Sequence, residues 1–183
     1  MVSGPSGVGK STITREVIRR TGADFSVSAT TRRPREGEVD ARDYVFVDPG
    51  AFQQMIDRDE LLEWAEVFGQ RYGTPAGPVR EALAAGRTVV LEIDVQGALQ
   101  VHRKMPDATF LLIAPPDGAE LARRLHGRGS EDAEGAAKRL EKAAQEIQAA
   151  RRSGVYNHCV VNDDLEAAIA RVVEIVNQER TNP

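Results

Sequence analysis

GPSGVGKS, residues 4–11, is the stretch that decides the fold, and Thr12 follows it directly. It matches the pattern G-x-x-x-x-G-K-[ST] at every fixed position. The glycines let the backbone curl with its N–H groups pointing inward, and the helix that follows adds its positive end. We expect Lys10 to reach the β- and γ-phosphates of a nucleoside triphosphate and Ser11 to offer its hydroxyl to Mg²⁺. The candidate residues for the triphosphate are Gly4, Pro5, Ser6, Gly7, Val8, Gly9, Lys10, Ser11 and Thr12.

Composition narrows the class of protein. The chain has 183 residues and a net charge of −4, so no overall basic field attracts a nucleic-acid polymer. Its single cysteine, Cys159, permits no internal disulfide and fits a reducing compartment. The sequence has no apolar run near the ~20 residues that span a bilayer, and no signal-peptide pattern. We therefore expect a cytoplasmic protein without nucleic-acid or membrane partners, and the choice between monomer and homo-oligomer stays open.

Short β-type runs alternate with helical periods, which predicts an α/β fold with a parallel sheet and helices on both faces. TVVLEI at 88–93 and TFLLIA at 109–114 are the expected core strands, with a short strand at 25–27 and the last strand at 155–161. The aromatic-rich residues 43–72 predict a small inserted unit around a helix at 49–57. Further helices are expected after the phosphate loop, at 78–85, 95–103, 117–124 and 130–152, and after Asp163 or Asp164.

The helix expected at 130–152 has an inward stripe made mostly of alanine. An alanine face buries little apolar area, so we expect weak docking and a moving lid. The stripe consists of Ala133, Ala136, Ala137, Leu140, Ala144 and Ile147. Cys159, in the last strand, is expected to be a buried apolar residue.

The sequence predicts a short first strand. Only Met1, Val2 and Ser3 precede the loop, whereas the strand that leads into such a loop is commonly about five residues long. We expect either a chain start that is assigned late, which we favour, or a short strand that supports the loop weakly.

A second anion site is indicated by residues 28–44, SATTRRPREGEVDARDY. Arg32, Arg33 and Arg35 fall within four positions, and Pro34 favours an extended conformation at Arg33. Arginine suits bidentate binding of phosphate better than lysine does. From charge alone, a solvated cluster remains an equal alternative.

The segment 28–44 resembles the acceptor loop of guanylate kinases, and the resemblance continues along the whole chain. It is carried by LEWA at 62–65, YGT at 72–74, EIDVQG at 92–97, RLHGRG at 124–129, KRL at 138–140 and VNDD at 161–164, in the order that the family uses. The resemblance implies a P-loop NTPase-type sheet in one domain over 1–183. Its parts are a core (1–27, 75–129 and 153–183), an inserted α+β GMP-binding unit (28–74) and a helical lid (130–152).

The resemblance also implies an activity, the transfer of the γ-phosphoryl group of ATP to GMP or dGMP, with Mg²⁺ as cofactor. It implies that Glu63 accepts the N1–H and 2-amino group of guanine, because an unpaired buried carboxylate would penalise AMP. Asp94 is expected near the acceptor and, through water, near Mg²⁺. The implied GMP-binding residues are Ser28, Arg32, Arg35, Glu38, Tyr44, Glu63, Tyr72, Gly73, Thr74 and Asp94.

The implied catalytic residues are Lys10, Arg35, Arg128 and Arg139, and Arg124 is expected to bind ATP and to assist them. The phosphate of GMP is already an anion at pH 7, so alignment and charge neutralisation suffice and no general base is needed. Asn162 and Asp163 are expected to border the adenine of ATP. Arg71 departs from the family, whose members often carry an aromatic residue before Tyr72.

Three alternatives stay open. The first is a guanylate-kinase-like module that binds phosphopeptides without catalysis, and the second is a kinase for another nucleoside monophosphate. A GTPase switch is the third, because residues 94–97 fit D-x-x-G, although the chain lacks the N-K-x-D signature. A complete phosphate loop together with the candidate arginines favours the enzyme, and Glu63 favours GMP as its acceptor.

Overall fold

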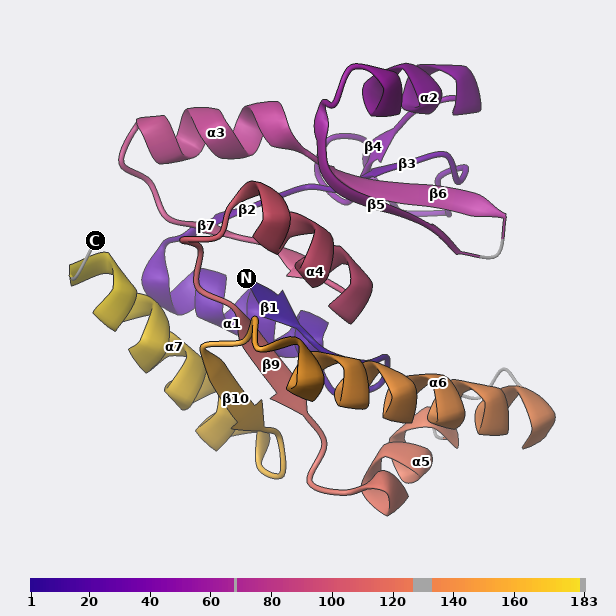
Figure 1. The fold of residues 1–183 in the computed structure, drawn as a ribbon, viewed down its shortest axis with the longest axis vertical. Helices are drawn as coiled ribbons and strands as arrows, with labels where there is room; N and C mark the ends of the chain where they lie inside the picture. Colours follow the sequence, from indigo (N-terminus) through magenta and orange to yellow (C-terminus); the bar gives the residue numbers. More distant parts are fainter. Residues whose placement is uncertain (68, 127–132, 182–183) are drawn as a thin grey trace.

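The structure, a computed structural model, describes residues 1–67, 69–126 and 133–181 (Figure 1). Its central sheet has four parallel strands in the order β10-β9-β1-β8, which confirms the expected parallel sheet. The strands are β1 Val2–Ser3, β8 Glu92–Ile93, β9 Leu111–Ala114 and β10 His158–Val161. β1 has only two residues, but it lies between β8 and β9 and pairs with both. The strand that leads into the phosphate loop is therefore central to the sheet.

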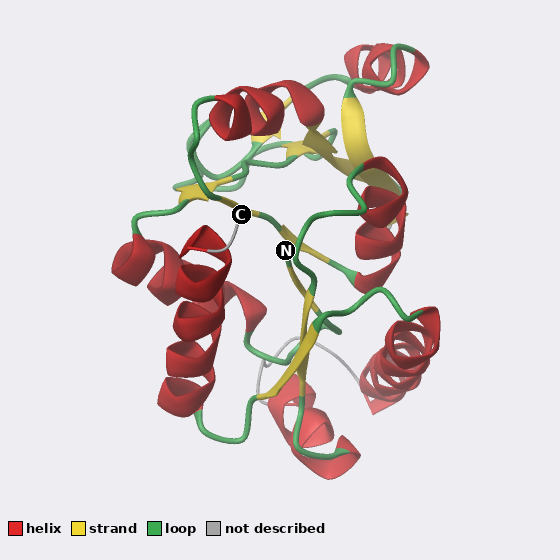
Figure 2. Ribbon diagram, turned by 60° about the vertical axis from the view of Figure 1, so that its left-hand side comes forward, coloured by secondary structure: helices red, strands yellow, loops and turns green. Residues whose placement is uncertain are grey.

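Helices cover both faces of this sheet (Figure 2). On one face α1 packs against α7, and on the other α4 packs against α6, which also contacts α5. Their bounds are α1 Lys10–Thr21, α4 Val95–Lys104, α5 Gly118–His126, α6 Ala133–Ser153 and α7 Leu165–Thr181. The α/β fold class predicted from the sequence is confirmed.

Apolar clusters hold these layers together, and the smallest of them joins α4, β9 and α6 through Val95, Leu112 and Ala150. The larger cluster joins β1, the phosphate loop, α1 and α7 through Val2, Val8, Ile13 and Ile169, which are almost completely buried. The second lies on the α4 side and consists of Leu62, Ala76, Val79, Leu91, Ile93, Ala98, Val101 and Phe110. Because Val8 is buried, the phosphate loop is packed onto the core and is not held by its ends alone.

A smaller sheet in the order β4-β3-β6-β5 forms the inserted unit, and helix α2 lies over it (Figure 1). Its strands are β3 Ala29–Thr30, β4 Val45–Phe46, β5 Leu61–Val67 and β6 Gln70–Pro75, and the helix is α2 Pro49–Asp57. Asp48 caps α2 by accepting a hydrogen bond from Ala51 N, so this helix has the predicted bounds. Ala29, Phe52 and Leu61 form the unit's own small core.

Several boundaries differ from the sequence prediction. Residues 88–93 do not form one strand, because β7 Val89–Val90 pairs with β2 Asp24–Phe25, whereas β8 pairs with β1. At the change of partner, Leu91 O accepts a hydrogen bond from Val2 N. The last strand, β10, is shorter than the predicted 155–161, and α3 Ala76–Ala84 begins two residues before the predicted 78–85.

The inward face of α6 also differs from the prediction. Leu140 packs against the larger core cluster as predicted and Ile147 is half-buried, but Ala144 is exposed; among the α6 side chains that the structure describes, the buried ones are Ala143, Glu146 and Ala150. The expected cap, Ser130, and the side chains of Ala133, Ala136 and Ala137 lie outside the described residues.

Cys159 was expected to be buried, and this prediction is wrong. It is exposed because β10 is an edge strand of the central sheet, and successive side chains on a strand face opposite ways. Its neighbour Val160 takes the buried position instead. Within the described ranges, no helix has both the length and the apolar composition needed to cross a bilayer.

Gly4 is the position where the phosphate loop meets the core most closely. It has a positive φ of 149°, and a Cβ placed there would lie 2.2 Å from Ile113 O. We expect Gly4→Ala to lower the free energy of unfolding by about 1–3 kcal/mol, since a main-chain oxygen must move. Gly118→Ala is the matched control, because a Cβ at Gly118 meets nothing within 4 Å. Equal unfolding temperatures for the two variants would contradict this account.

Candidate active site

The phosphate loop runs between β1 and α1 and has the geometry of an anion cradle. Gly7 and Gly9 have positive φ values of 86° and 91°. A Cβ at Gly9 would lie 2.7 Å from Asn162 Nδ2, so this position has no room for a side chain. Gly9 is also the N-cap of α1 and has no side chain to bond the first-turn N–H groups, which leaves them available to an anion.

Lys10 and Ser11 lie at the start of α1, and both are engaged. The ammonium of Lys10 donates to Gly4 O (2.6 Å) and Pro5 O (2.8 Å), which holds it over the loop. The hydroxyl of Ser11 donates to Glu92 Oε1 at 2.5 Å. Glu92 did not figure among the predicted site residues. The available signal was a lone charge inside the apolar run TVVLEI.

Asp94 follows β8 and begins α4. As the N-cap of this helix, it accepts a hydrogen bond from Gly97 N at 2.7 Å. Its Oδ1 lies 3.4 Å from the position that a Cβ on Gly97 would take, and Glu63 Oε2 lies 2.9 Å from the same point. The first turn of α4 therefore brings the carboxylates of Asp94 and Glu63 close together.

Glu63 is a buried carboxylate on β5, only 7% exposed. Its Oε1 accepts a hydrogen bond from Thr74 Oγ1 at 2.6 Å, because β5 and β6 pair with Glu63 opposite Thr74. Burial raises the pKa of Glu63 to about 7, and the charge of Asp94 adds to this, while the Thr74 hydrogen bond opposes it. The structure thus brings Glu63 and Thr74 together as predicted, and the Glu63 carboxyl group titrates near neutral pH.

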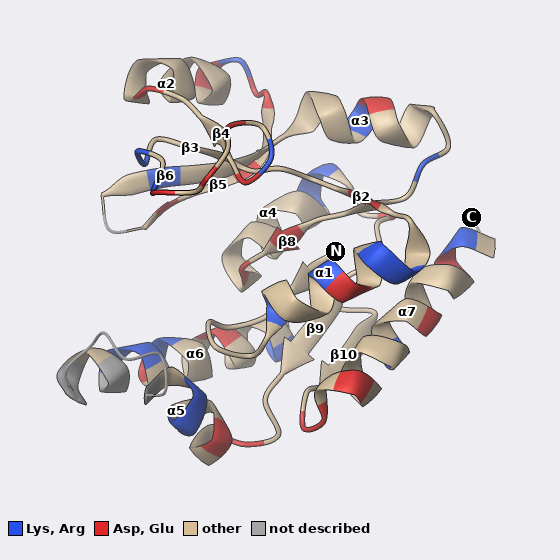
Figure 3. Cartoon of the chain, turned by 180° about the vertical axis from the view of Figure 1, so that it is seen from behind, with Lys and Arg blue, Asp and Glu red and all other residues tan. Residues whose placement is uncertain are grey.

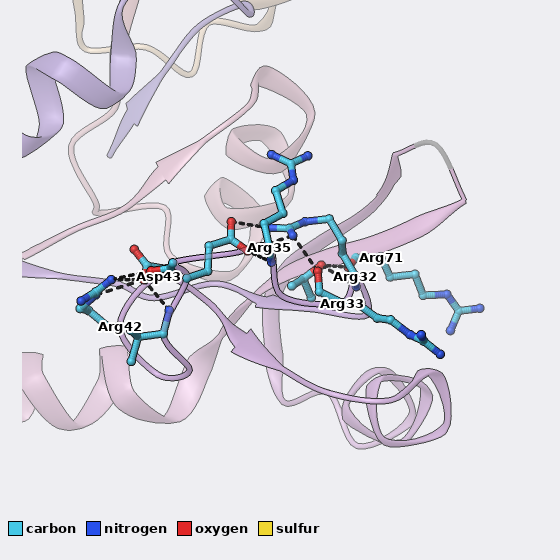
Figure 4. Close-up of polar contacts among 10 residues, drawn as sticks. Arg32, Arg33, Arg35, Arg42, Asp43 and Arg71 are labelled. Atoms are coloured by element: carbon cyan, nitrogen blue, oxygen red, sulfur yellow. Dashed lines mark hydrogen bonds and ion pairs between the residues drawn. The ribbon is translucent and has the colours of Figure 1, made fainter.

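Arg32 is held in a fixed orientation by Glu38 (Figure 4). Its two terminal nitrogens donate to the two carboxylate oxygens of Glu38 at 2.8 and 3.0 Å. Glu38 also accepts a hydrogen bond from Arg35 N at 2.7 Å. The bond from Arg32, followed by the bond from Arg35 N, lowers the pKa of Glu38. The guanidinium of Arg32 lies 5.3 Å from the ring centre of Tyr44, so these residues form one cluster.

The tyrosines complete this cluster, and Arg71 lies apart from it. The ring of Tyr44 meets that of Tyr72 edge-on, with centres 6.0 Å apart. Arg71 instead donates to Gln53 Oε1 at 2.8 Å and lies over Trp64, because neighbouring residues of β6 face opposite sides. In Figure 4 the side chain of Arg35 points away from those of Arg33 and Arg71. The departure from the family at position 71 therefore lies on the far face of the strand.

The remaining predicted GMP-site residues lie beside this cluster. Ser28 is half-buried ahead of β3, and its carbonyl accepts a hydrogen bond from Val45 N at 2.9 Å. Gly73 pairs with Ala29 on β3 and with Trp64 on β5, and a Cβ there would lie 2.8 Å from Glu63 O. Gly73 therefore permits the close approach of β6 to β5 beside Glu63.

Helices α5 and α6 both carry basic residues (Figure 3). Arg124, on α5, donates to Glu120 Oε1 at 2.6 Å and to Asn162 O at 2.9 Å. Arg139 is half-buried on α6, and Arg128 lies outside the described residues. The structure thus ties Arg124 to the 161–164 segment and leaves the predicted position of Arg128 untested.

Asn162 ties that segment to the phosphate loop. It is 3% exposed, and its Nδ2 donates to Val8 O at 2.8 Å. Its Oδ1 is buried and has no hydrogen-bond partner among the described residues. Asp163 is exposed at the same end of β10, and its side chain accepts a hydrogen bond from Asp164 N.

Glu146 is a second buried acid that the sequence prediction missed. It lies on α6, is 8% exposed, and its Oε1 is 3.9 Å from Lys142 Nζ. Burial and then the charge of Asp94 raise its pKa, while Lys142 and Lys10 oppose this. The carboxyl group of Glu146 on α6 is therefore close enough to Lys10 and Asp94 to interact with their charges.

The raised pKa of Glu63 predicts a pH-dependent stability. Between pH 4.5 and about 7 the folded protein holds a proton at Glu63 that the unfolded chain has released. The free energy of unfolding therefore falls as pH rises through this window, by up to about 3 kcal/mol. Glu63→Gln removes this contribution, so its stability relative to the parent protein should increase from pH 5 to pH 8 in urea titrations. A difference that does not change with pH would contradict the assignment.

Comparison with known proteins agrees with this geometry. The family model described as guanylate kinase matches residues 1–179. The guanylate kinase of Gloeobacter violaceus is 51% identical over 98% of this chain and 86% of its own length. A guanylate kinase of Thermus thermophilus is 47% identical over 98% of this chain and 80% of its own length. Among solved structures, a guanylate kinase from Anaplasma phagocytophilum matches with a TM-score of 0.74 and 32% identity, covering 98% of this chain and 84% of that one. The chain belongs to the guanylate kinase family.

Proposed function

We propose that this chain transfers the γ-phosphoryl group of ATP to GMP, giving ADP and GDP, through the residues described above. One observation carries the proposal. Glu92, on β8, accepts the Ser11 hydroxyl of the phosphate loop, and two residues later Asp94 lies beside Glu63 and the first turn of α4. A triphosphate site and a buried acceptor-side carboxylate therefore share one strand end, where α/β sheets commonly bind ligands. The guanylate kinase family, matched over nearly the full chain, has this activity by name.

In the ATP half, the loop N–H groups and the start of α1 hold the phosphates, and Lys10 moves from Gly4 O and Pro5 O to phosphate oxygens. Asn162 and Asp163 border the adenine, and the buried, unpartnered Oδ1 of Asn162 supports a polar role there. Mg²⁺ prefers oxygen ligands and keeps several waters, which suits the Ser11 hydroxyl with Glu92 and, through water, Asp94. When bound, Mg²⁺ neutralises charge on the transferring phosphates.

In the GMP half, the ionised carboxylate of Glu63 accepts the N1–H and 2-amino group of guanine, with the hydroxyls of Ser28 and Thr74 nearby. Adenine lacks this pair of adjacent donors, so AMP would leave a buried acceptor unpaired. The acceptor phosphate is held by Arg32, Arg35, Tyr44 and Tyr72, and Gly73 lets the strand approach closely. Glu38 holds Arg32 in readiness by its two hydrogen bonds.

Catalysis in this proposal needs alignment and positive charge. The GMP phosphate is an anionic nucleophile, and Lys10, Arg35, Arg128 and Arg139 neutralise charge as the phosphoryl group passes, with Arg124 assisting. We divide the chain into a core (1–27, 75–129 and 153–183), a GMP-binding unit (28–74) and a lid (130–152). Closure of the lid excludes water and so limits ATP hydrolysis.

The alternatives are less favoured. A module that binds phosphopeptides without catalysis does not require a complete phosphate loop, whereas this chain retains Lys10 and Ser11 in an ordered cradle. The relatives named above are guanylate kinases, and each aligns with this chain over nearly its full length. The cytoplasmic location remains a prediction, and the choice between GMP and dGMP stays open.

Lys10→Ala tests the ATP half. We expect kcat to fall by about 10²–10³-fold or more, because a preorganised charge on the phosphates is lost. The fold should survive, since the ammonium of Lys10 donates to Gly4 O and Pro5 O at the surface of the loop and the side chain is not part of the apolar core. A coupled assay of ADP formation measures the loss, and Lys142→Ala, an exposed lysine on α6, is the matched control. Near-normal turnover by a folded Lys10→Ala protein would contradict the role of Lys10 on the phosphates of ATP.

Glu63→Gln tests the GMP half. Glutamine can accept one hydrogen bond from guanine but opposes the second donor with its own amide. We expect the ratio of kcat/KM for GMP to that for AMP to fall about ten- to a hundred-fold. Initial rates with each acceptor at saturating ATP give this ratio. An unchanged ratio would remove Glu63 from guanine selection.

A further inference from the structure

The edge strand β5 is held by a side chain of helix α4. β5 lies at the end of the sheet order β4-β3-β6-β5, so none of the described strands pairs with the main-chain groups on its outer side. At Trp64, the carboxamide of Gln100 takes the place of that strand. Trp64 N donates to Gln100 Oε1 at 3.1 Å, and Gln100 Nε2 donates to Trp64 O at 2.9 Å. One amide thus supplies the pair of hydrogen bonds that a neighbouring antiparallel strand would make with this residue.

The two hydrogen bonds between Gln100 and Trp64 lie one residue from Glu63. The pairing of β5 with β6 is irregular between Leu61 and Glu63, a kind of irregularity that re-aims a side chain and weakens the local ladder. Three residues before Gln100, on the same face of α4, Gly97 leaves space for the Glu63 carboxylate, since a Cβ there would lie 2.9 Å from Oε2. One face of α4 therefore leaves space for the Glu63 carboxylate at Gly97 and makes hydrogen bonds to β5 through Gln100.

A second side chain of α4 ties the other end of the irregular segment. Lys104 Nζ donates to Leu61 O at 2.6 Å and to Asp59 Oδ1 at 2.5 Å. Lys104 thus holds β5 where it begins, and Gln100 holds it next to the carboxylate. Of the two residues, Gln100 is the one whose contact adjoins Glu63.

We propose that Gln100 is a positioning residue for guanine selection, which acts through the main chain of Trp64 to aim Glu63 at the bound base. The proposal rests on the role assigned to Glu63 in the proposed function. Gln100 itself contacts neither substrate. Loss of its amide lets β5 shift at the irregular segment, so the Glu63 carboxylate samples positions that fit the two guanine donors less well.

The test combines Gln100→Ala with Glu63→Gln in a double-mutant cycle. In the parent background, we expect Gln100→Ala to raise KM for GMP and to lower the GMP-to-AMP ratio of kcat/KM about tenfold, because two hydrogen bonds are lost. The KM for ATP should stay within about twofold. In the Glu63→Gln background, the same change should leave the ratio within about twofold. Arg103→Ala, an exposed position on the same helix, is the control.

Each outcome bears on the proposal. An unchanged ratio in folded Gln100→Ala overturns it, and so does an equal fall in both backgrounds, which would show that Gln100 acts independently of Glu63. If Glu63→Gln alone leaves the ratio unchanged, the proposed function fails in its GMP half, which is a distinguishable result. Gln100→Met, which has a similar length and helix propensity but no amide, is measured in parallel and should show the same tenfold loss. It serves as the test if Gln100→Ala does not fold.

Discussion

The parallel pairing of β1 with β8 is the constraint on which the rest of the site depends. Val2 pairs with Glu92 and Ser3 with Ile93, and both strands then end at the same edge of the sheet. β1 leads directly into the phosphate loop, and β8 leads into Asp94 and α4. Because Glu92 bonds Ser11 while Asp94 lies beside Glu63, this register sets the separation between the phosphate loop and the buried carboxylate of Glu63, the two parts to which we assign ATP and GMP.

The site contains carboxyl groups whose burial costs free energy, and lysine and arginine side chains whose positive charge offsets part of this cost. Glu63 and Glu146 are both nearly inaccessible and both have raised pKa values, with Asp94 close to each. A buried carboxylate with an incomplete set of hydrogen bonds is destabilising until a ligand supplies donors. In the proposed function, guanine supplies two such donors at Glu63, so the feature that lowers the stability of the free protein would also favour guanine over adenine.

Much of the fold could be predicted from the sequence, because the phosphate loop is specified locally by its glycines and by Lys10 and Ser11. The pairing of Glu63 with Thr74 could be reached only through family resemblance, since it depends on the register of two strands. Glu92, Glu146 and Gln100 escaped prediction because their roles arise from contacts between distant elements. The error at Cys159 has the same origin, because strand order, which makes β10 an edge, is a property of the whole sheet.

The central claim is that one site joins ATP and GMP for direct phosphoryl transfer. The most direct test is ³¹P NMR of the protein with ATP, Mg²⁺ and GMP, followed over time. The account predicts that ADP and GDP accumulate in equal amounts without free phosphate, and that AMP in place of GMP gives little product. ADP with inorganic phosphate and no GDP, or no turnover at all with GMP, would contradict it.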